Sequence, residues 1–478
     1  MTNVLFTASE STPFVKTGGL ADVIGSLPKA LKQQGHADVR VILPKYDHFP
    51  EPFASSLVKK TSFTVNVGWR EHIAELFEYE HDGITYYFIS NDYYFGRNNV
   101  YGYFDDGERY VYFCRAVIDA LPYLDFTPDV LHAHDWQTGL AVAFANILQP
   151  IEGMRTVFTI HNIQYQGWLM YEAFDDLFNL PRDHFAGFEW KGMLNCMKSG
   201  IFHADKITTV SPSYAQEIMD PYFGEGLDPL LRERHLDVAG VINGIDTDSY
   251  NPQNDPNIPV QYKHSREKKR QNKEIIQEEL GLPVRGDVPL YIAISRFVEQ
   301  KGFHLLERIL PEFLQQDVQV VLLGTGDYEF ESSFSWIAHM HHERMATVLT
   351  FDEKLARRLY AASDFFIMPS KFEPCGLSQL IALMYKSVPI VRETGGLKDT
   401  VIPFNQYTGT GNGFSFQNYN AHELLQSLQY SLSVFHDPLQ WKALMKNVNK
   451  SSFSWKDSAA AYADIYKELT AGAIKESD

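Results

Sequence analysis

The chain has 478 residues, and 60 acidic side chains outnumber 42 lysines and arginines, which gives a formal net charge of −18. Such a length suits roughly two to four domains. An aromatic fraction of 14% excludes disorder as the dominant state. The acidic balance argues against a protein that mainly binds nucleic acid, because phosphate binding needs a positive field.

The sequence shows no pattern typical of a disulfide-rich, secreted or membrane-spanning protein. The three cysteines imply no disulfide framework, which fits a reducing compartment. The first cation is Lys16, so the charged segment that opens a signal peptide is missing. No apolar run approaches the roughly 18 residues that a membrane helix needs. We therefore expect a cytoplasmic globular protein without membrane contact.

Short apolar runs alternate with helical patterns along the whole chain. The runs at 4–8 and 39–43 flank a helical pattern that starts at Leu20, which predicts a β-α-β unit and a parallel sheet. Further strands are predicted at 129–133, 156–160 and 206–210. A second series is predicted at 238–242, 290–294, 318–323, 346–351, 365–368 and 388–391. The pattern favours two doubly wound α/β halves in tandem.

The seam between the two halves is expected near residues 243–250. We predict a first domain over 1–243, a second over 244–455, and a C-terminal helix over 456–478 that packs back on the first domain. The charge-rich segment 263–280 is interpreted as an amphipathic helix with a solvated face rather than a nucleic-acid patch. Ligands of open parallel sheets bind beyond the carboxyl ends of the strands, so we expect a cleft between facing domains.

Two Gly-Gly turns follow predicted strands. Lys16 precedes Gly18 and Gly19, and such a turn exposes backbone amides while the lysine adds charge suited to a phosphate. A plain tight turn is the alternative. Thr394-Gly395-Gly396 repeats the device. Neither is a G-x-G-x-x-G or Walker motif, so no nicotinamide cofactor is expected.

Two cations lie just beyond the predicted strand 290–294. Arg296 and Lys301 could neutralise a diphosphate leaving group, although two surface cations would be the commoner case. Glu373 precedes a predicted helix whose free amides would favour an anion, at Gly376 and Leu377. Glu373 could hold sugar hydroxyls or serve as a helix-terminal carboxylate, and Cys375 could be a packing residue.

Histidines follow two strands of the first half. His132-Ala133-His134-Asp135-Trp136 invites a metal interpretation, but no further ligand is evident, so no metal is expected. The aromatic ring of Trp136 beside the Asp135 carboxylate suits a carbohydrate. His161 could be a catalytic imidazole or a structural one. Asp246 and Asp248 resemble a metal-binding Asp-x-Asp pair but are interpreted as a chance match. The histidines and glutamate at 339–343 are interpreted as a solvated cluster.

Together these motifs resemble bacterial glycogen synthases and plant starch synthases. They occur in the same order and span about residues 3 to 470: 16–23, 132–136, 159–162, 243–246, 295–302, 373–377 and 394–397. The resemblance implies two Rossmann-like domains facing across a cleft, the GT-B fold. It implies retaining transfer of glucose from ADP-glucose to the non-reducing 4-OH of an α-1,4-glucan such as glycogen. No cofactor is implied.

The resemblance also implies roles for individual residues. The catalytic set would be Glu373, Arg296, Lys301 and His161. Donor binding would fall to Lys16, Gly18, Gly19, Tyr360, Cys375, Gly376, Leu377, Thr394, Gly395 and Gly396, with Tyr360 packing on adenine. Acceptor binding would fall to Asp22, Asp135, Trp136 and Asn243.

The sequence departs from related patterns at two points. Ile381 stands where the Glu-x7-Glu pattern of other retaining glycosyltransferases, counted from Glu373, has its second glutamate, which favours the synthase branch. Lys371 stands where arginine is also common. A phosphorylase with a Schiff-base cofactor, a sugar-nucleotide epimerase and a non-enzymatic glucan-binding protein are the alternatives. The choice of ADP-glucose over UDP-glucose and the oligomeric state stay open.

Overall fold

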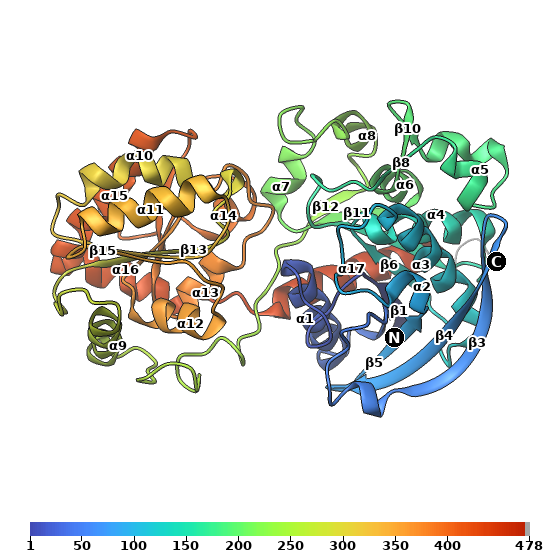
Figure 1. The fold of residues 1–478 in the computed structure, drawn as a ribbon, viewed down its shortest axis with the longest axis horizontal. Helices are drawn as coiled ribbons and strands as arrows, with labels where there is room; N and C mark the ends of the chain where they lie inside the picture. Colours follow the sequence, from blue (N-terminus) through green and yellow to red (C-terminus); the bar gives the residue numbers. More distant parts are fainter. Residues whose placement is uncertain (474–478) are drawn as a thin grey trace. The chain divides into compact units, whose positions relative to one another are not determined.

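The computed structural model describes residues 1–473 and forms two compact units (Figure 1). The first unit comprises Met1–Gly244 and the segment from Trp455 onward, and the second comprises Ile245–Ser454. The last predicted helical residues, 474–478, lie outside the described part of the chain.

A nine-stranded sheet forms the centre of the first unit, in the order β12-β11-β7-β6-β1-β2-β5-β4-β3. Neighbours from β12 to β5 pair in parallel, whereas β4 pairs antiparallel with both β5 and β3. The strands are β1 (Thr2–Thr7), β2 (Ala37–Pro44), β3 (Val58–Val67), β4 (Arg70–His81), β5 (Ile84–Ser90), β6 (Val130–His134), β7 (Arg155–Ile160), β11 (Lys206–Thr209) and β12 (Val238–Gly240).

Helices cover both faces of this sheet because the side chains of each strand alternate between them. Val4 and Phe6 pack in one core with α1 and α17, and Leu5 packs in the other with α3 and α4. The helices are α1 (Gly19–Gln33), α2 (Asp92–Phe95), α3 (Asp106–Ala120), α4 (Trp136–Leu148), α5 (Ala173–Leu177), α6 (Cys196–His203), α7 (Pro212–Glu217), α8 (Asp228–Glu233) and α17 (Trp455–Ala473). A small antiparallel sheet joins β8 (Trp168–Leu169), β10 (Met193–Asn195) and β9 (Glu189–Trp190).

The second unit is built on a six-stranded parallel sheet in the order β15-β14-β13-β16-β17-β18. Its strands are β13 (Leu290–Ile294), β14 (Gln319–Leu323), β15 (Met345–Val348), β16 (Phe365–Met368), β17 (Val388–Arg392) and β18 (Phe414–Phe416). Figure 1 shows α10, α11 and α15 on one face and α9 and α12 on the other. The helices are α9 (Arg266–Glu279), α10 (Phe303–Phe313), α11 (Tyr328–Met340), α12 (Glu353–Ala362), α13 (Ser378–Met384), α14 (Gly395–Thr400), α15 (Ala421–His436) and α16 (Pro438–Lys450).

The run predicted at 238–242 was grouped with the second series of strands, although the predicted first domain, 1–243, includes it. In the structure β12 pairs in parallel with β11 of the first unit, with Val238 opposite Ile207. The grouping with the second series was wrong because a short apolar run does not show which sheet it joins, and pairing is set by tertiary contacts. The long hairpin of β3 and β4 was not predicted.

The strand order reverses once in the parallel part of each sheet. In the first unit the chain proceeds outward from β1 through β2 to β5, and from β6 through β7 to β12 in the other direction. In the second unit β13 and β16 are the corresponding central neighbours. Ligands of doubly wound sheets bind at such reversals, beyond the carboxyl ends of the strands.

The last described helix completes the first core. In Figure 1, α17 (red) lies beside α1 (blue), and Tyr462 and Tyr466 are buried with Val4 and Phe6. The hydroxyl of Tyr466 lies 2.7 Å from Nδ1 of His132 on β6, so a polar contact also ties the helix to the sheet.

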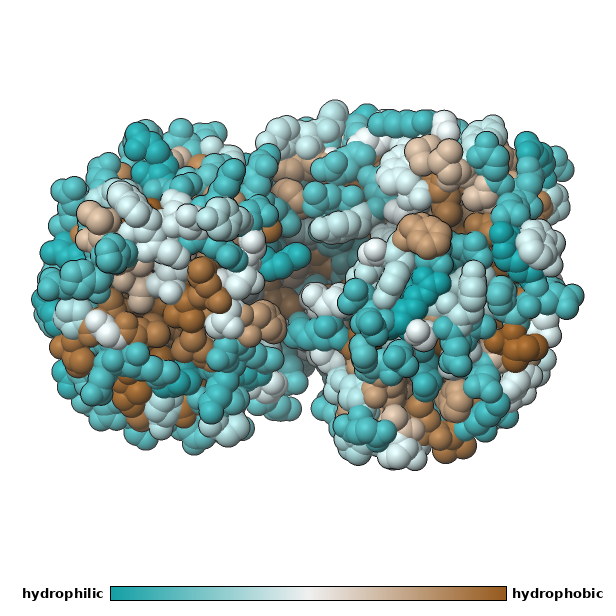
Figure 2. Space-filling view, in the orientation of Figure 1, coloured by the Kyte–Doolittle hydropathy of each residue, from teal (hydrophilic) through white to brown (hydrophobic). Residues whose placement is uncertain are grey.

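The exterior is mostly hydrophilic on the face shown in Figure 2, with apolar side chains gathered in limited areas. Among residues 1–473, no helix combines the length and apolar character needed to cross a membrane.

Candidate active site

An ion pair marks the strand reversal of the second unit. Nζ of Lys301, in the loop after β13, lies 2.6 Å from Oε2 of Glu373, in the loop after β16. The hydroxyl of Ser370 donates to the same oxygen at 3.1 Å. Glu373 is 7% exposed, so this carboxylate is held in a fixed orientation with Oε2 engaged. The structure thus brings two predicted site residues into contact.

A glycine allows the two loops to approach. Gly302 follows Lys301 with φ +74°, and a Cβ atom there would lie 2.0 Å from the carbonyl oxygen of Pro369. The amide of Lys371 donates to the carbonyl of Gln300 at 2.8 Å and joins the same loops. The close backbone contact places Lys301 beside Glu373.

Arg296 lies in the same loop as Lys301 but has a different environment. Its neighbour Phe297 is fully buried, and the Phe297 amide donates to the carbonyl of Thr325 at 2.9 Å, which anchors the loop. The guanidinium of Arg296 is exposed and forms no ion pair with any described residue. A fixed loop therefore presents a cation that is available to an anionic ligand.

The second Gly-Gly turn packs directly on the loop that carries Glu373. A Cβ atom on Gly395 would lie 2.0 Å from the carbonyl oxygen of Glu373, and one on Gly396 would lie 2.2 Å from that of Cys375. The amide of Gly396 donates to the carbonyl of Pro374 at 3.0 Å. The structure therefore groups Thr394, Gly395 and Gly396 with Glu373, Cys375, Gly376 and Leu377.

Tyr360, which the resemblance assigns to adenine packing, is largely buried in the second unit. Its side chain on α12 is 4% exposed and packs in the core near Phe366 and Tyr385, with ring centroids 5.4 and 6.1 Å away. These contacts fix the ring on its core side, and its packing on adenine stays a prediction. Periodicity alone gives no warning of this burial, since an aromatic residue on an amphipathic helix suits either position.

Glu10 organises the first Gly-Gly turn and was missed by sequence reasoning. It is 3% exposed, and its Oε2 accepts from the amide and the hydroxyl of Thr17 at 2.6 and 2.7 Å. Burial raises the pKa of Glu10. Lys16 forms a 2.8 Å ion pair with Asp22 of α1. The sequence feature that could have identified Glu10 is its position three residues beyond the end of β1, where site residues of parallel sheets lie.

His134, the last residue of β6, and the next residue, Asp135, hold His161, which follows β7. Oδ1 of Asp135 accepts from the backbone amides of His161 and Asn162 at 2.7 and 3.3 Å. Nδ1 of His134 lies 3.0 Å from Nε2 of His161. Backbone and ring of His161 are therefore fixed by neighbouring residues of one strand end.

Asp135 is held under backbone strain. Its φ of 58° and ψ of 179° fall in a region that essentially only glycine occupies. Burial raises the pKa of its carboxyl to about 7. A strained, partly desolvated carboxylate at a strand reversal is typical of a functional position.

Trp136 and Asn243 complete the predicted set in the first unit. A Cβ atom on Gly167 would lie 2.1 Å from Cε3 of Trp136, so only glycine leaves room for the indole. The ring also meets Tyr110 edge-on at 5.3 Å. Asn243 is 6% exposed, and its Oδ1 is a buried acceptor without a hydrogen-bond partner in the described part of the chain.

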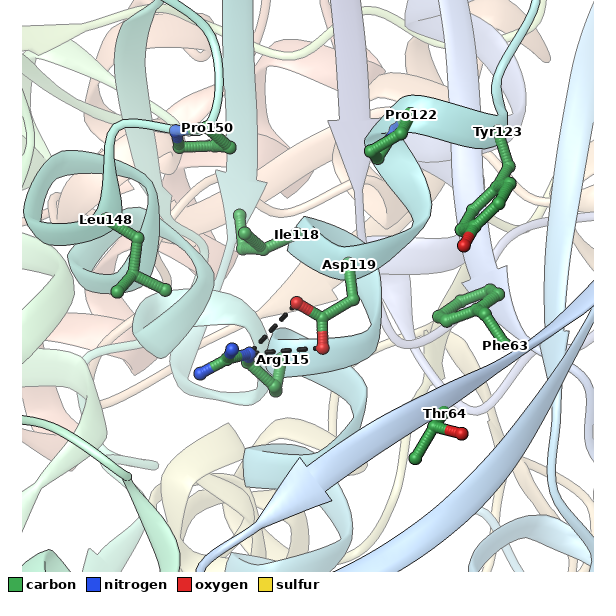
Figure 3. A pocket seen from close by; sticks show the side chains of 9 residues that line it. All are labelled: Phe63, Thr64, Arg115, Ile118, Asp119, Pro122, Tyr123, Leu148 and Pro150. Carbon is green, nitrogen blue, oxygen red and sulfur yellow. Dashed lines mark hydrogen bonds and ion pairs between the residues drawn. The ribbon is translucent and has the colours of Figure 1, made fainter.

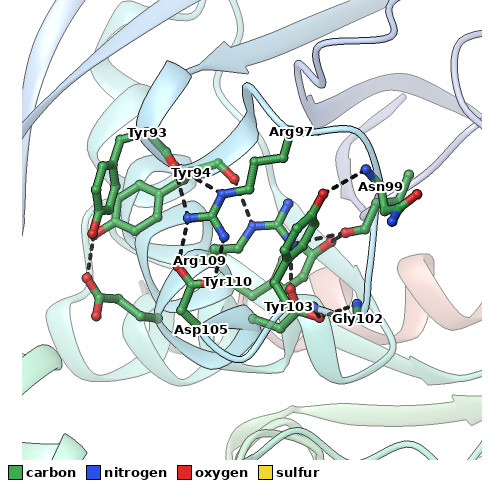
Figure 4. Close-up of polar contacts among 12 residues, drawn as sticks. Tyr93, Tyr94, Arg97, Asn99, Gly102, Tyr103, Asp105, Arg109 and Tyr110 are labelled. Atoms are coloured by element: carbon green, nitrogen blue, oxygen red, sulfur yellow. Dashed lines mark hydrogen bonds and ion pairs between the residues drawn. The ribbon is translucent and has the colours of Figure 1, made fainter.

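A tyrosine and arginine cluster between β5 and α3 orders a further loop (Figure 4). Arg109, buried, donates to the carbonyls of Tyr94 and Val100 at 2.7 and 3.1 Å. The cluster fixes the segment that carries Tyr101, whose hydroxyl lies 2.7 Å from Oγ of Ser9 beyond β1. Sequence reasoning did not select Tyr101.

Other candidate positions carry no such arrangement. Oδ1 of Asp246 accepts from the amides of Asp248 and Ser249, both at 3.0 Å, so it closes a local turn. In the described part of the chain, no three His, Cys, Asp or Glu side chains are grouped to hold a metal ion. A shallow pocket of about 570 Å³ lies between Phe63, Arg115 and Tyr123 and includes none of the predicted site residues (Figure 3).

Comparison with known proteins decides the family. The family model for the starch synthase catalytic domain matches residues 3–233, and that for glycosyl transferases group 1 matches 273–443. A glycogen synthase from Oceanobacillus iheyensis is 59% identical over 99% of both chains. The chain belongs to the bacterial glycogen synthase family. The resemblance to bacterial glycogen synthases seen in the sequence motifs is confirmed.

Other glycogen synthases and a solved starch synthase extend the comparison. A glycogen synthase from Exiguobacterium sibiricum is 48% identical over 98% of this chain and 99% of its own. The catalytic domain of starch synthase IV from Arabidopsis thaliana, bound to ADP and acarbose, is 32% identical with a TM-score of 0.90, over 98% of this chain and 99% of that one. This member of the glycogen synthase family is therefore a glycosyltransferase with the GT-B fold, as predicted.

Proposed function

We propose that this glycosyltransferase moves glucose from ADP-glucose to the non-reducing 4-OH of an α-1,4-glucan, with retention of configuration and release of ADP. The Lys301–Glu373 pair at the strand reversal, beside the exposed Arg296, is the observation that carries the proposal. The glycogen synthase relatives support a glucan acceptor, and the ADP bound to starch synthase IV supports an adenine nucleotide.

The charges of the second unit suit departure of a diphosphate. Breaking the bond between C1 and the diphosphate oxygen leaves positive character on the sugar and negative charge on ADP. Arg296 and Lys301 would stabilise that charge, as preorganised cations do where charge develops. We assign further phosphate contacts to Lys16 and to the amides of Gly18, Gly19, Gly376 and Leu377.

Glu373 is assigned to the donor sugar. Its Oε2 is occupied by Lys301 and Ser370, which leaves Oε1 to accept from a sugar hydroxyl. Because a diphosphate is a good leaving group, the step needs no protonated carboxylic acid of the kind that glycosidases use. Attack by the acceptor hydroxyl on the face from which ADP departs, with ADP taking its proton, retains the configuration.

The direct test offers glycogen with ADP-glucose or UDP-glucose and measures the nucleotide released. We expect glycogen-dependent ADP release, undiminished by EDTA, and NMR of the product should show new α-1,4 linkages. Release of UDP alone would contradict the donor assignment. Nucleotide release without glucan would contradict glucosyl transfer to a polymer.

A further inference from the structure

We propose that His134 is a positioning residue that fixes the tautomer of His161, with the ring proton of His161 on Nδ1, where a bound ligand can accept it. The tautomer follows from contacts within the first unit. Its use in glucosyl transfer rests on the proposed function.

The contact between the two rings is buried and confined. Nδ1 of His134 and Nε2 of His161 are 3.0 Å apart. The ring of His134 is fully buried and lies against His132 and Phe6, with centroids 4.2 and 5.0 Å away. The opposite nitrogen of His134, Nε2, is buried and has no hydrogen-bond partner among residues 1–473.

Each ring carries a single proton at neutral pH. Burial lowers the pKa of His161 to about 3 and that of His134 well below its ordinary range. A neutral imidazole has one N–H donor and one acceptor nitrogen. The two facing nitrogens must therefore share one proton, which leaves two possible arrangements.

The unpaired nitrogen of His134 distinguishes these arrangements. If His161 donated from Nε2, the proton of His134 would sit on its Nε2 as a buried donor without an acceptor. If His134 donates from Nδ1, its Nε2 is only an unused acceptor. Buried N–H groups without an acceptor are rarer in proteins than buried acceptors without a donor, so this second arrangement is favoured. Nδ1 of His161 is not among the buried unpaired atoms of the described residues, and the residue is only partly buried, so a proton on Nδ1 would not be an orphaned buried donor.

The consequence is an uncharged donor at the strand end. His161 would offer an Nδ1–H to a ligand oxygen without adding a positive charge, which suits a sugar hydroxyl. Oδ1 of Asp135 accepts from the backbone amide of His161 at 2.7 Å and so fixes its backbone. The orientation and the proton position of His161 are thus controlled by two adjacent side chains.

The test reads the tautomer by long-range ¹H–¹⁵N correlation NMR of protein labelled on its histidine rings. The signals of His161 are those missing from His161→Gln. We expect a protonated Nδ1 and an unprotonated Nε2 in the wild type. A protonated Nε2 on His161 would overturn the proposal, whether or not the protein transfers glucose.

Two substitutions of similar size test whether His134 is the cause. The amide of His134→Asn can still donate at the position of Nδ1, whereas His134→Leu cannot. We expect Asn to keep the wild-type signals of His161, and Leu to give mixed tautomers together with a lower kcat. His203→Leu, at another histidine whose Nε2 is unpaired, should leave the His161 signals unchanged.

The outcomes separate this proposal from the proposed function. Wild-type tautomer signals in a folded His134→Leu variant would overturn the role of His134. Normal signals in a protein without glucosyl transfer would contradict the proposed function and still support the tautomer assignment.

Discussion

Lys301 and Glu373 are 72 positions apart in the sequence, yet Nζ and Oε2 lie 2.6 Å apart where β13 and β16 diverge. Each side chain is largely withdrawn from solvent, with 17% and 9% of its surface exposed. Removing one member of such a pair leaves the other as a buried charge without compensation. The neighbouring Arg296 is exposed and forms no ion pair with a described residue, so its removal leaves no buried charge uncompensated.

This difference predicts two kinds of inactive variant. Arg296→Ala should lose at least about 100-fold in turnover, the effect of removing one preorganised donor, with an unchanged melting temperature. Lys301→Ala should lose activity to a similar degree and also about 3 kcal/mol of stability. ADP release assays and thermal unfolding measure both quantities. Full activity in Arg296→Ala would contradict the assigned role.

The second Gly-Gly turn should tolerate no side chain. In Gly395→Ala the new methyl group would meet the carbonyl of Glu373, a backbone atom that cannot move cheaply. We expect a large loss of both turnover and stability. Gly281, with φ +72° and open space around its Cβ position, is the matched control. Gly281→Ala should cost about 1 kcal/mol through backbone strain and leave turnover normal.

Asp135 should make stability depend on pH. Burial raises its pKa from the ordinary 3.8 to about 7, so between these values the folded protein holds a proton that the unfolded chain has lost. Its contribution to stability therefore falls as pH rises from about 4 to about 7. Asp135→Asn cannot ionise and should melt at a higher temperature than wild type at pH 8, with no such gain near pH 4.

Thermal unfolding between pH 4 and pH 8 checks this prediction. The exposed Asp248→Asn is the control and should follow the wild type at every pH. An Asp135→Asn variant that is less stable than wild type at pH 8 would contradict it.

The hydroxyl of Tyr466 should stabilise the first unit. Tyr466→Phe leaves Nδ1 of the fully buried His132 without its 2.7 Å partner, a loss of about 1–3 kcal/mol. The melting temperature should fall accordingly. Tyr407→Phe, at an exposed tyrosine, should leave it unchanged. Equal melting temperatures for Tyr466→Phe and wild type would show that this contact adds nothing.

The sequence predicts the parallel core well because its strands are short apolar runs followed by helical periodicity. β13 and β16 were predicted with the bounds that the structure shows. The β3–β4 hairpin was missed because its strands, 10 and 12 residues long, contain no continuous apolar run. Exposed residues, many of them charged, lie between the buried ones. The assignment of β12 failed because pairing partners depend on tertiary packing.

Predicting the site depends on a different kind of information. Motifs after strand ends identified Lys301 and Glu373, since parallel strands bring their carboxyl ends together. Neither the direct contact nor the support of Glu10 for Thr17 could be predicted, because both depend on side-chain direction. The burial of Tyr360 could not be predicted either, because an aromatic residue on an amphipathic helix can face the core or a ligand.

The return of α17 to the first unit has a consequence for how the protein is made. A ribosome must synthesise all of residues 245–454 before the segment that buries Val4 and Phe6 becomes available. Domains generally fold as they emerge during synthesis. The second unit can therefore finish folding first, and the N-terminal half of the chain must wait for its last helix while its apolar sheet face is incompletely covered.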